Sequence, residues 1–405
     1  MKHVQRMQRM NRANRMQRGV TLIELMVAIV IGLVVTLAVT NLLIFSESNK
    51  RTTTATNDMS QTGAYAAYVL DRAVRAAGSG FTQSWSLAGA FGCRLNATLP
   101  ASPNLPRGSA FPAPFASSFL GGASGSANLR VAPVLIGKNQ SDAGSDVLVV
   151  MGGTAASGDV PRLILSAGKS AEILRLDSTV GLAEGDLGLV SANGTTDCLL
   201  EQVHAGSAFA DTTGNDALPL GSTYYTASGK ATTLGTLAAS GTAYFTPLGN
   251  VGAGNTQFQM FGVGSNHTLY SYDLLMGNAT DASQAIADGV AEMHALYGLD
   301  TNADGVLDTW VDPGAAGYDI ATLMATPATA RQVVAVRIAL VLRSAGYEKA
   351  NANGELPSPA SLTLFNDLAA SLRQTVSFST DEQHFRHRVV ETTVPLRNVL
   401  LLPTS

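Results

Sequence analysis

Residues 18–46 read RGVTLIELMVAIVIGLVVTLAVTNLLIFS, and this stretch decides the fold of the 405-residue chain. From Leu25 to Ser46 it holds 22 residues without a charge, most of them Leu, Ile, Val and Ala. As a helix at ~1.5 Å per residue this run is about 33 Å long, enough to cross a bilayer core of ~30 Å. The sequence therefore predicts a membrane-spanning helix close to the N-terminus.

The charges around this run predict its orientation. Residues 1–19 carry six basic residues and no acidic one, whereas the rest of the chain has 20 basic and 30 acidic residues. Because positive charge stays on the cytoplasmic side, we expect a cytoplasmic N-terminus and a periplasmic body anchored in the inner membrane. Outside the first 19 residues no basic patch occurs, so nucleic acid is not an expected partner.

The cleavage point is unusual for an exported chain. An ordinary secretory signal is cut after its apolar run, but here the best point lies before the run, after Gly19. Val20 would then be the new N-terminus and Glu24 the fifth residue. A carboxylate in an apolar helix is costly in a bilayer, and the α-amino group of a neighbouring helix could neutralise it. The alternative is an interfacial glutamate that reaches water and has no special role.

The string RGVTLIEL, from Arg18 to Leu25, resembles the class III signal of type IV prepilins and type II secretion pseudopilins. The resemblance implies a membrane-embedded prepilin peptidase that cuts after Gly19 and methylates the new N-terminus at Val20. It also makes Glu24 the glutamate used in fibre assembly. Val20 departs from the Phe that major pilins usually carry, and this departure favours a minor pilin.

The helical pattern resumes beyond the membrane run. Residues 49–58 are polar and Thr-rich, a weak helix stretch. From Ala64 to Ala77 apolar residues recur at spacings of three and four, until Gly78 and Gly80 end the pattern. We therefore expect an α+β, pilin-like fold with a basic leader over 1–19, a transmembrane or fibre-core helix over 20–46, an amphipathic extension over 47–78 and an antiparallel β-rich body over 79–405.

The body is expected to have two parts. Residues 81–130 indicate loop and 205–265 irregular β structure, so 81–265 is interpreted as a variable part and 266–405 as a better ordered part. In the latter, residues 331–343 predict a long strand with one apolar face and a second face that is partly covered. Residues 387–401 predict a closing strand, in which Pro395 marks an edge or a bulge.

The run 333–344 and the ending RHRVVETTVPLRN (386–398) resemble the PilW family of minor pilins. The resemblance implies a subunit that primes or caps type IV pilus assembly, with consequences for twitching motility and adhesion. The implied partners are the prepilin peptidase, other minor pilins, the major pilin, the inner-membrane assembly platform and a tip adhesin. The implied final location is the pilus at the cell surface.

One stretch of the body has the pattern of a metal site. Alternating oxygen ligands followed by Gly305 match the first half of a calcium loop. An EF-hand would need an acid where Val311 stands, so a true EF-hand is excluded. The alternative is a surface turn rich in Asp and Asn. The candidate Ca²⁺ ligands are Asp300, Asn302, Asp304, Val306, Asp308 and Asp312.

The remaining reactive residues predict no catalysis. Cys93 and Cys198 lie in the exported part and can form a disulfide, or stay as two buried thiols. His384 and His387 stand next to acidic residues and indicate a solvated turn. No HExxH, GxSxG or complete P-loop motif occurs, so we do not expect an enzyme.

Two other functions remain open at this stage. The chain could be a minor pseudopilin of type II secretion (GspJ-like), although those proteins are usually much shorter. It could also be a tip-located adhesin or binding module that uses residues 81–265, and this role is compatible with a minor pilin.

Overall fold

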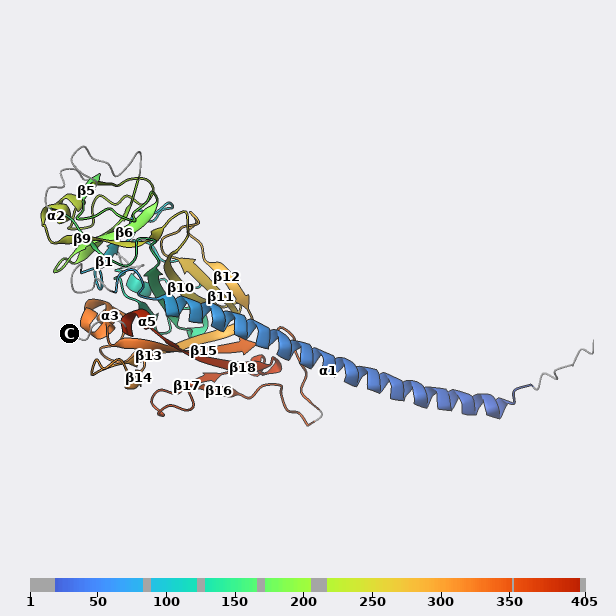
Figure 1. Cartoon of the computed structure of the whole chain (residues 1–405). Helices are drawn as coiled ribbons and strands as arrows, with labels where there is room; N and C mark the ends of the chain where they lie inside the picture. The colour runs from blue at the N-terminus through green and yellow to red at the C-terminus, as the bar shows by residue number, and fades with distance from the viewer. Residues whose placement is uncertain are drawn as a thin grey trace, which may run out of the picture. The chain divides into compact units, whose positions relative to one another are not determined.

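The computed structural model describes residues 19–82, 89–121, 128–165, 172–204, 217–351 and 353–400 (Figure 1). It divides into two compact units, Met1–Thr54 and Ala55–Ser405. The predicted α+β, pilin-like class is confirmed, because the second part of a long N-terminal helix packs on a large, mainly antiparallel β body. The leader residues 1–18 lie outside the described residues.

Helix α1 (Leu22–Ala76) is continuous through the stretch that the sequence marks as weak. There the hydroxyl groups of Thr53 and Ser60 donate to backbone carbonyls four residues earlier, at 2.9 Å and 2.8 Å. Such bonds satisfy polar side chains within the helix itself. The expected joining of the two helical halves is thus confirmed.

The second part of α1 packs on the body through the predicted apolar face. Gly63 permits close approach, because a Cβ at this position would collide with the side chain of Leu342. The helix ends where Gly78 adopts a φ of +80° and donates its N–H to Met151 O at 2.8 Å. Buried residues on this face are Met59, Ala66, Leu70, Ala73, Val74 and Ala77.

The described residues of the body form three main sheets. One has the order β1-β7-β6-β9-β4, one has β12-β11-β10-β3-β2 and one has β14-β13-β15-β18. Most pairs are antiparallel, and β1 and β7 form a parallel pair. The strand bounds in the same order are Arg94–Asn96, Asp197–Gln202, Asp186–Ala192, Ala243–Asn250 and Arg162–Leu163; Gln284–Asp288, Thr268–Asp273, Thr256–Gly264, Val147–Gly153 and Val134–Gly137; Thr309–Val311, Val290–Leu299, Val333–Arg343 and His387–Pro395.

The other described strands form two small sheets. One pairs β5 (Ile173–Arg175) with β8 (Ala217–Pro219), and the other is the hairpin of β16 (Ser361–Leu364) and β17 (Gln374–Ser377). The short helices are α2 (Leu234–Ala239), α3 (Ile320–Ala325), α4 (Pro327–Ala330) and α5 (Arg397–Leu400), with 3-10 turns η1 (Phe119–Gly121), η2 (Asp142–Gly144) and η3 (Glu382–His384).

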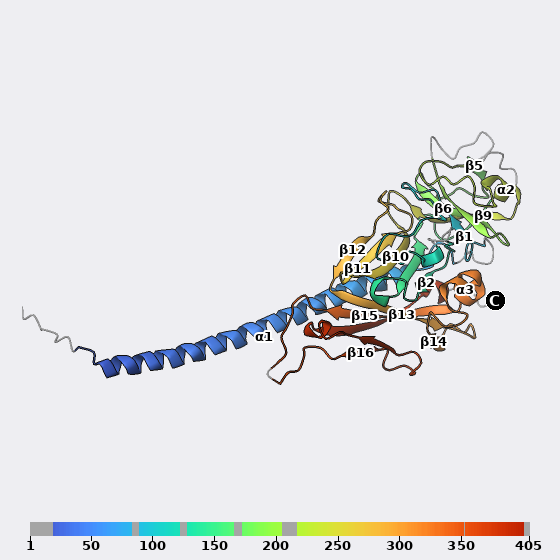
Figure 2. The same cartoon turned by 180° about the vertical axis from the view of Figure 1, so that it is seen from behind.

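Strand β15 has the two covered faces that its sequence predicts. Its even-numbered residues, such as Ile338 and Leu340, join the main core with the second part of α1. Ala339 and Val341 on the other face join a smaller cluster with Phe365 beside β16. Hairpin β16–β17 therefore covers the opposite side of the sheet from α1 (Figures 1 and 2).

Two details of the sequence prediction are wrong. The stretch 205–265 holds the long regular strands β9 and β10, because aromatic residues such as Phe245 and Phe258 anchor them in the core. The closing strand stops at Pro395 instead of Leu401, and α5 follows it. The division at residue 265 falls in the turn between β10 and β11, so strands from both sides of it share one sheet.

Candidate functional site

The predicted processing site lies directly before α1. Gly19, Val20 and Thr21 are outside regular secondary structure, and the helix begins at Leu22. Val20 is 68% exposed, and a Cβ built on Gly19 would meet no atom within 4 Å. The peptide bond between Gly19 and Val20 is therefore open to a peptidase within the part of the chain that the structure describes.

Thr21 acts as the N-terminal cap of the helix, a role that the sequence analysis missed. Its Oγ1 accepts the Glu24 N–H at 3.3 Å, and its carbonyl accepts the Leu25 N–H at 3.0 Å. Thr21 and Glu24 have the spacing of a capping box, which could have revealed this cap. The cap places Glu24 in the first helical turn, where the N–H groups favour negative charge.

The first part of α1 presents an apolar surface on every side. From Val20 to Phe45 its large aliphatic and aromatic side chains are all about half exposed or more. A helix that is apolar all round is stable only inside a core or a membrane. Leu22–Ala76 is also the one described helix that has the length and hydropathy needed to cross a bilayer. This surface requires a cover that the chain itself does not provide within the described residues.

The expected calcium loop forms a network of turns. The Asp300 carboxylate is buried and accepts the N–H groups of Asp304 at 3.2 Å and Gly305 at 2.7 Å. Asn302 Oδ1 also accepts the Asp304 N–H, at 3.0 Å. Asp308 accepts from both the N–H and the hydroxyl of Thr301, each at 2.7 Å. These bonds give the side chains that the sequence offers to Ca²⁺ a role in holding the loop itself.

Asp312 does not converge with the other candidate ligands. Its carboxylate receives Lys138 Nζ at 2.7 Å, and it also accepts the Gly314 N–H. Val306 lies in the exposed part of the loop, and its N–H is held by Asp304. Over the described ranges, no group of three or more His, Cys, Asp or Glu residues could hold a metal ion. The calcium site therefore stays a prediction.

Cys93 and Cys198 form a disulfide with a Cα–Cα distance of 5.6 Å. Cys198 lies on β7 opposite Leu95 of β1, and Cys93 directly precedes β1. The bond therefore joins the loop segment after α1 to the sheet that contains β6, β7 and β9. Because its two ends are 105 residues apart, it restricts a large part of the unfolded chain.

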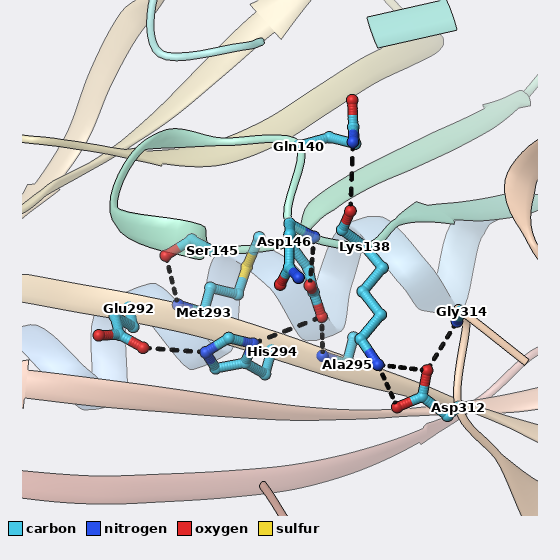
Figure 3. A network of polar contacts seen from close by, with 11 residues as sticks. Lys138, Gln140, Ser145, Asp146, Glu292, Met293, His294, Ala295, Asp312 and Gly314 are labelled. Carbon is cyan, nitrogen blue, oxygen red and sulfur yellow. Dashed lines mark hydrogen bonds and ion pairs between the residues drawn. The ribbon is translucent and has the colours of Figure 1, made fainter. Parts of the chain in front are cut away.

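A buried polar network joins the two sheets nearest to α1 (Figure 3). Asp146 precedes β3, and its carboxylate accepts the N–H groups of Asn139 and Ala295, each at 2.9 Å. His294 of β13 lies between two acids, with Nδ1 3.7 Å from Asp146 Oδ2 and Nε2 3.0 Å from Glu292 Oε2. The contacts link the β2–β3 turn region to β13.

The charges of this network favour the imidazolium form of His294. Burial alone would lower the pKa of the imidazole, but the two nearby carboxylates, Asp146 at 3.7 Å and the hydrogen-bonded Glu292, outweigh burial and raise it to about 9. The ion pair Lys138–Asp312 lies beside this network in Figure 3 and links β2 to the end of β14. The arrangement can hold sheets together, and nothing in it positions a nucleophile.

His387 differs from the solvated turn predicted from the sequence. Its side chain is 1% exposed, lies in β18 and stacks on Phe378 at a centroid distance of 3.9 Å. Burial lowers its pKa to about 4, against the opposing effect of the Glu382 charge. The prediction failed because Phe378, nine residues away in the chain, supplies the cover.

Comparison with known families gives two matches. Residues 256–398 match the family model of Type IV Pilus-assembly protein W, PilW, and residues 14–40 match the Prokaryotic N-terminal methylation motif. The first match runs from β10 into α5, and the second contains Gly19, Val20 and Glu24. Neither a curated protein nor a solved structure matched the chain.

Proposed function

We propose, on the premise that this chain is a PilW-like type IV pilin, that it is a minor pilin which primes or caps type IV pilus assembly. One observation carries the proposal. The accessible Gly19–Val20 bond is followed by a helix whose first part exposes an apolar surface on all sides. This helix has a single acid, Glu24, in its first turn. Such a helix suits insertion first into lipid and then into a bundle of similar helices.

The proposed processing changes the charge at the start of the helix. A prepilin peptidase would hydrolyse the bond after Gly19, remove six cations with the leader and leave the N-methylated α-amino group of Val20. The leader keeps the N-terminus cytoplasmic, since basic residues resist translocation. The body, with its disulfide, then lies in the periplasm, which permits disulfide formation.

The proposed role of Glu24 is charge neutralisation during assembly. Taking a carboxylate out of water without a partner costs several kcal/mol, so an isolated Glu24 resists deep burial in an apolar bundle. The α-amino group of a neighbouring subunit would supply the opposite charge. Correct assembly then stabilises both the Glu24 carboxylate and the neighbouring α-amino group. A mispositioned subunit would leave one of these two charges without a partner.

The proposed partners follow from these steps. They are the prepilin peptidase, the inner-membrane assembly platform, other minor pilins, the major pilin and a tip adhesin. The chain begins as a single-pass inner-membrane protein and ends in the pilus at the cell surface. In this proposal the chain acts as a structural subunit that packs into the fibre and stabilises it.

Substitution of Glu24 tests this proposal. We expect Glu24→Ala to be processed normally, because the cleaved bond is unchanged, but to enter sheared pili at least about tenfold less, a loss of ~1.4 kcal/mol or more. Glu47→Ala is the matched control, since Glu47 is an exposed acid on the same helix. The measurement is the amount of this chain in fibre and membrane fractions. Equal incorporation of Glu24→Ala and wild-type chains would contradict the proposal.

A second candidate role is a binding module at the fibre tip. The sheet that contains β6, β7 and β9 has a hydrophobic cluster of its own, with Leu199 and Phe245 at its centre. Gly153 and Thr256 are direct partners in the β3–β10 pair, so deletion of residues 155–254 leaves the two strand ends adjacent. The deletion also removes Leu187, Leu200 and Leu248 from the main core. The deletion removes Cys198, so it is combined with Cys93→Ser to avoid a free thiol. If residues 155–254 bind a surface, cells with this variant will keep their pili and lose attachment. Unchanged attachment would exclude this role.

A further inference from the structure

Strand β18 lies at the edge of the β14-β13-β15-β18 sheet. On one side it pairs with β15 from Arg343↔His387 to Ala335↔Pro395. On its other side, no strand among the described residues pairs with it. An edge strand of this length presents a row of backbone donors and acceptors to other chains.

The pairing register fixes which backbone groups point away from the sheet. At one end the Ser344 N–H donates to Arg386 O at 2.9 Å, and at the other the Leu396 N–H donates to Val334 O at 2.8 Å. Along an antiparallel pair the backbone N–H and C=O groups of successive residues point alternately toward the partner strand and away from it. The backbone groups of the even-numbered residues of β18 therefore bond to β15, and those of the odd-numbered residues point outward. The outward residues are His387, Val389, Glu391, Thr393 and Pro395.

The outward groups differ in whether they are satisfied. The His387 N–H donates to Ser358 Oγ at 2.8 Å, and Pro395 has no N–H to satisfy. The N–H groups of Val389, Glu391 and Thr393 have no acceptor on any described residue. Three consecutive outward positions therefore remain available for a new hydrogen-bonded strand.

The side chains of β18 do little to discourage such pairing. Edge strands are usually protected by lysines, bulges or early prolines, but here Pro395 comes only at the end of the strand. Val389, Val390 and Thr392 are β-branched, which suits an extended, partly buried strand. The exposed charge, Arg388, is turned toward α1 and donates to Ser60 Oγ at 2.9 Å.

We propose that this edge receives an extended segment of another pilus subunit, which adds a fifth strand beside β18. Backbone bonds to Val389, Glu391 and Thr393 would supply the affinity, and the alternating faces would select the sequence. Neighbours of Val390 and Val394 continue the core under α1, whereas neighbours of Glu391 and Thr393 lie on the face where Val389 joins the smaller cluster and Glu391 bonds to Arg337. The segment therefore has apolar side chains at the alternate positions that face the core under α1. This inference rests on the proposed minor-pilin function.

A second copy of this chain does not fit the antiparallel arrangement. Ser60 contacts Arg388, Gly63 faces Val390, and Ala77 O accepts from Asn398 Nδ2 at 2.9 Å, so α1 and β18 run in the same direction. Antiparallel pairing of two β18 edges would make the two α1 helices point in opposite directions. Two subunits anchored in one membrane by these helices cannot adopt that arrangement.

Hydrogen exchange of the full-length chain tests the edge directly. In chain purified alone in detergent, the amides of residues 389, 391 and 393 should exchange rapidly. In the complex isolated from membranes through a tag on this chain, they should slow by at least about tenfold, as expected for newly bonded amides. Equal exchange in both samples would overturn the inference.

Proline substitution provides a second test. Thr393→Pro removes an outward N–H and leaves the bonds to β15 intact, so the melting temperature should change little. We expect it to reduce recovery of the chain in sheared pili severalfold, whereas Thr393→Ser, which keeps the N–H, behaves as wild type. Full incorporation of the Thr393→Pro variant would overturn the inference.

The two proposals fail in different ways. If the wild-type chain never enters pili, the minor-pilin function fails. If it enters pili while residues 389–393 exchange as in the isolated chain, only the edge inference fails. Photo-crosslinking from position 393 identifies the occupant: an extended segment of a different pilus subunit supports the inference, and a second copy of this chain contradicts it. Position 180, whose valine is exposed in the loop between β5 and β6, serves as the control.

Discussion

His294 is a buried residue whose charge affects the stability of the body. Its pKa is raised to about 9, above the ordinary value of 6.5, by Asp146 and Glu292 against the opposing effect of burial. The protonated form therefore stabilises the fold fully below pH ~6.5, and this stabilisation is lost as the pH rises through ~9. The predicted loss is on the order of 3 kcal/mol.

The test is the free energy of unfolding of the detergent-solubilised chain between pH 6.5 and 9. We expect a decline for the wild type and a flatter curve for His294→Asn. His204→Gln is the control, because His204 is exposed and should leave the slope unchanged. A wild-type curve that stays level over this range would show that His294 is not charged in the fold.

The sequence signal for Gly19 and Glu24 is local. The two residues lie within six positions of each other, directly before the apolar run, so their proposed roles can be inferred from sequence alone. The partners of His294 could not be found in this way. Asp146 is 148 positions distant in the chain and meets His294 only after two sheets pack together.

At the scale of elements, the loop between β13 and β14 is held by its own carboxylates. Asp300 accepts two backbone N–H groups and is almost fully buried. Asp300→Ala should therefore destabilise the chain by about 2 kcal/mol even in EDTA, because two backbone N–H groups of the loop lose a charged acceptor. Thermal unfolding measures this effect, and an unchanged melting temperature in EDTA would contradict it.

The same experiment examines calcium. If the loop binds Ca²⁺, adding the ion raises the melting temperature of the wild type but not that of the variant Asp300→Ala, Asp304→Ala. Coincident wild-type curves in Ca²⁺ and EDTA would make the calcium prediction wrong.

Elements whose apolar residues repeat at a regular spacing were predicted from the sequence, and elements without such a repeat were not. Helix α1 and strand β15 have apolar residues repeating at helical and strand spacing. Strands β9 and β10 lie in a stretch rich in Gly, Thr and Ser, and the role of their aromatic residues as anchors becomes visible only in the core. Helix α5 is four residues long, too short for its period to be recognised.

At the scale of the whole molecule, the α+β, pilin-like fold class could be predicted from the sequence, whereas the order of strands in the sheets is known only from the structure. Gly153 pairs with Thr256 across about a hundred intervening residues, and no local pattern specifies such a pairing. The long apolar helix, by contrast, is a property of one continuous stretch. The proposed function depends mainly on this stretch and on the site before it.

The N-terminal residue of the mature chain tests the central claim most directly. N-terminal mass analysis of the protein from membranes, with and without prepilin peptidase, measures it. The account predicts N-methylated Val20 when the peptidase is present and an intact leader when it is absent. A mature chain that begins at any other residue in peptidase-containing cells would contradict the account.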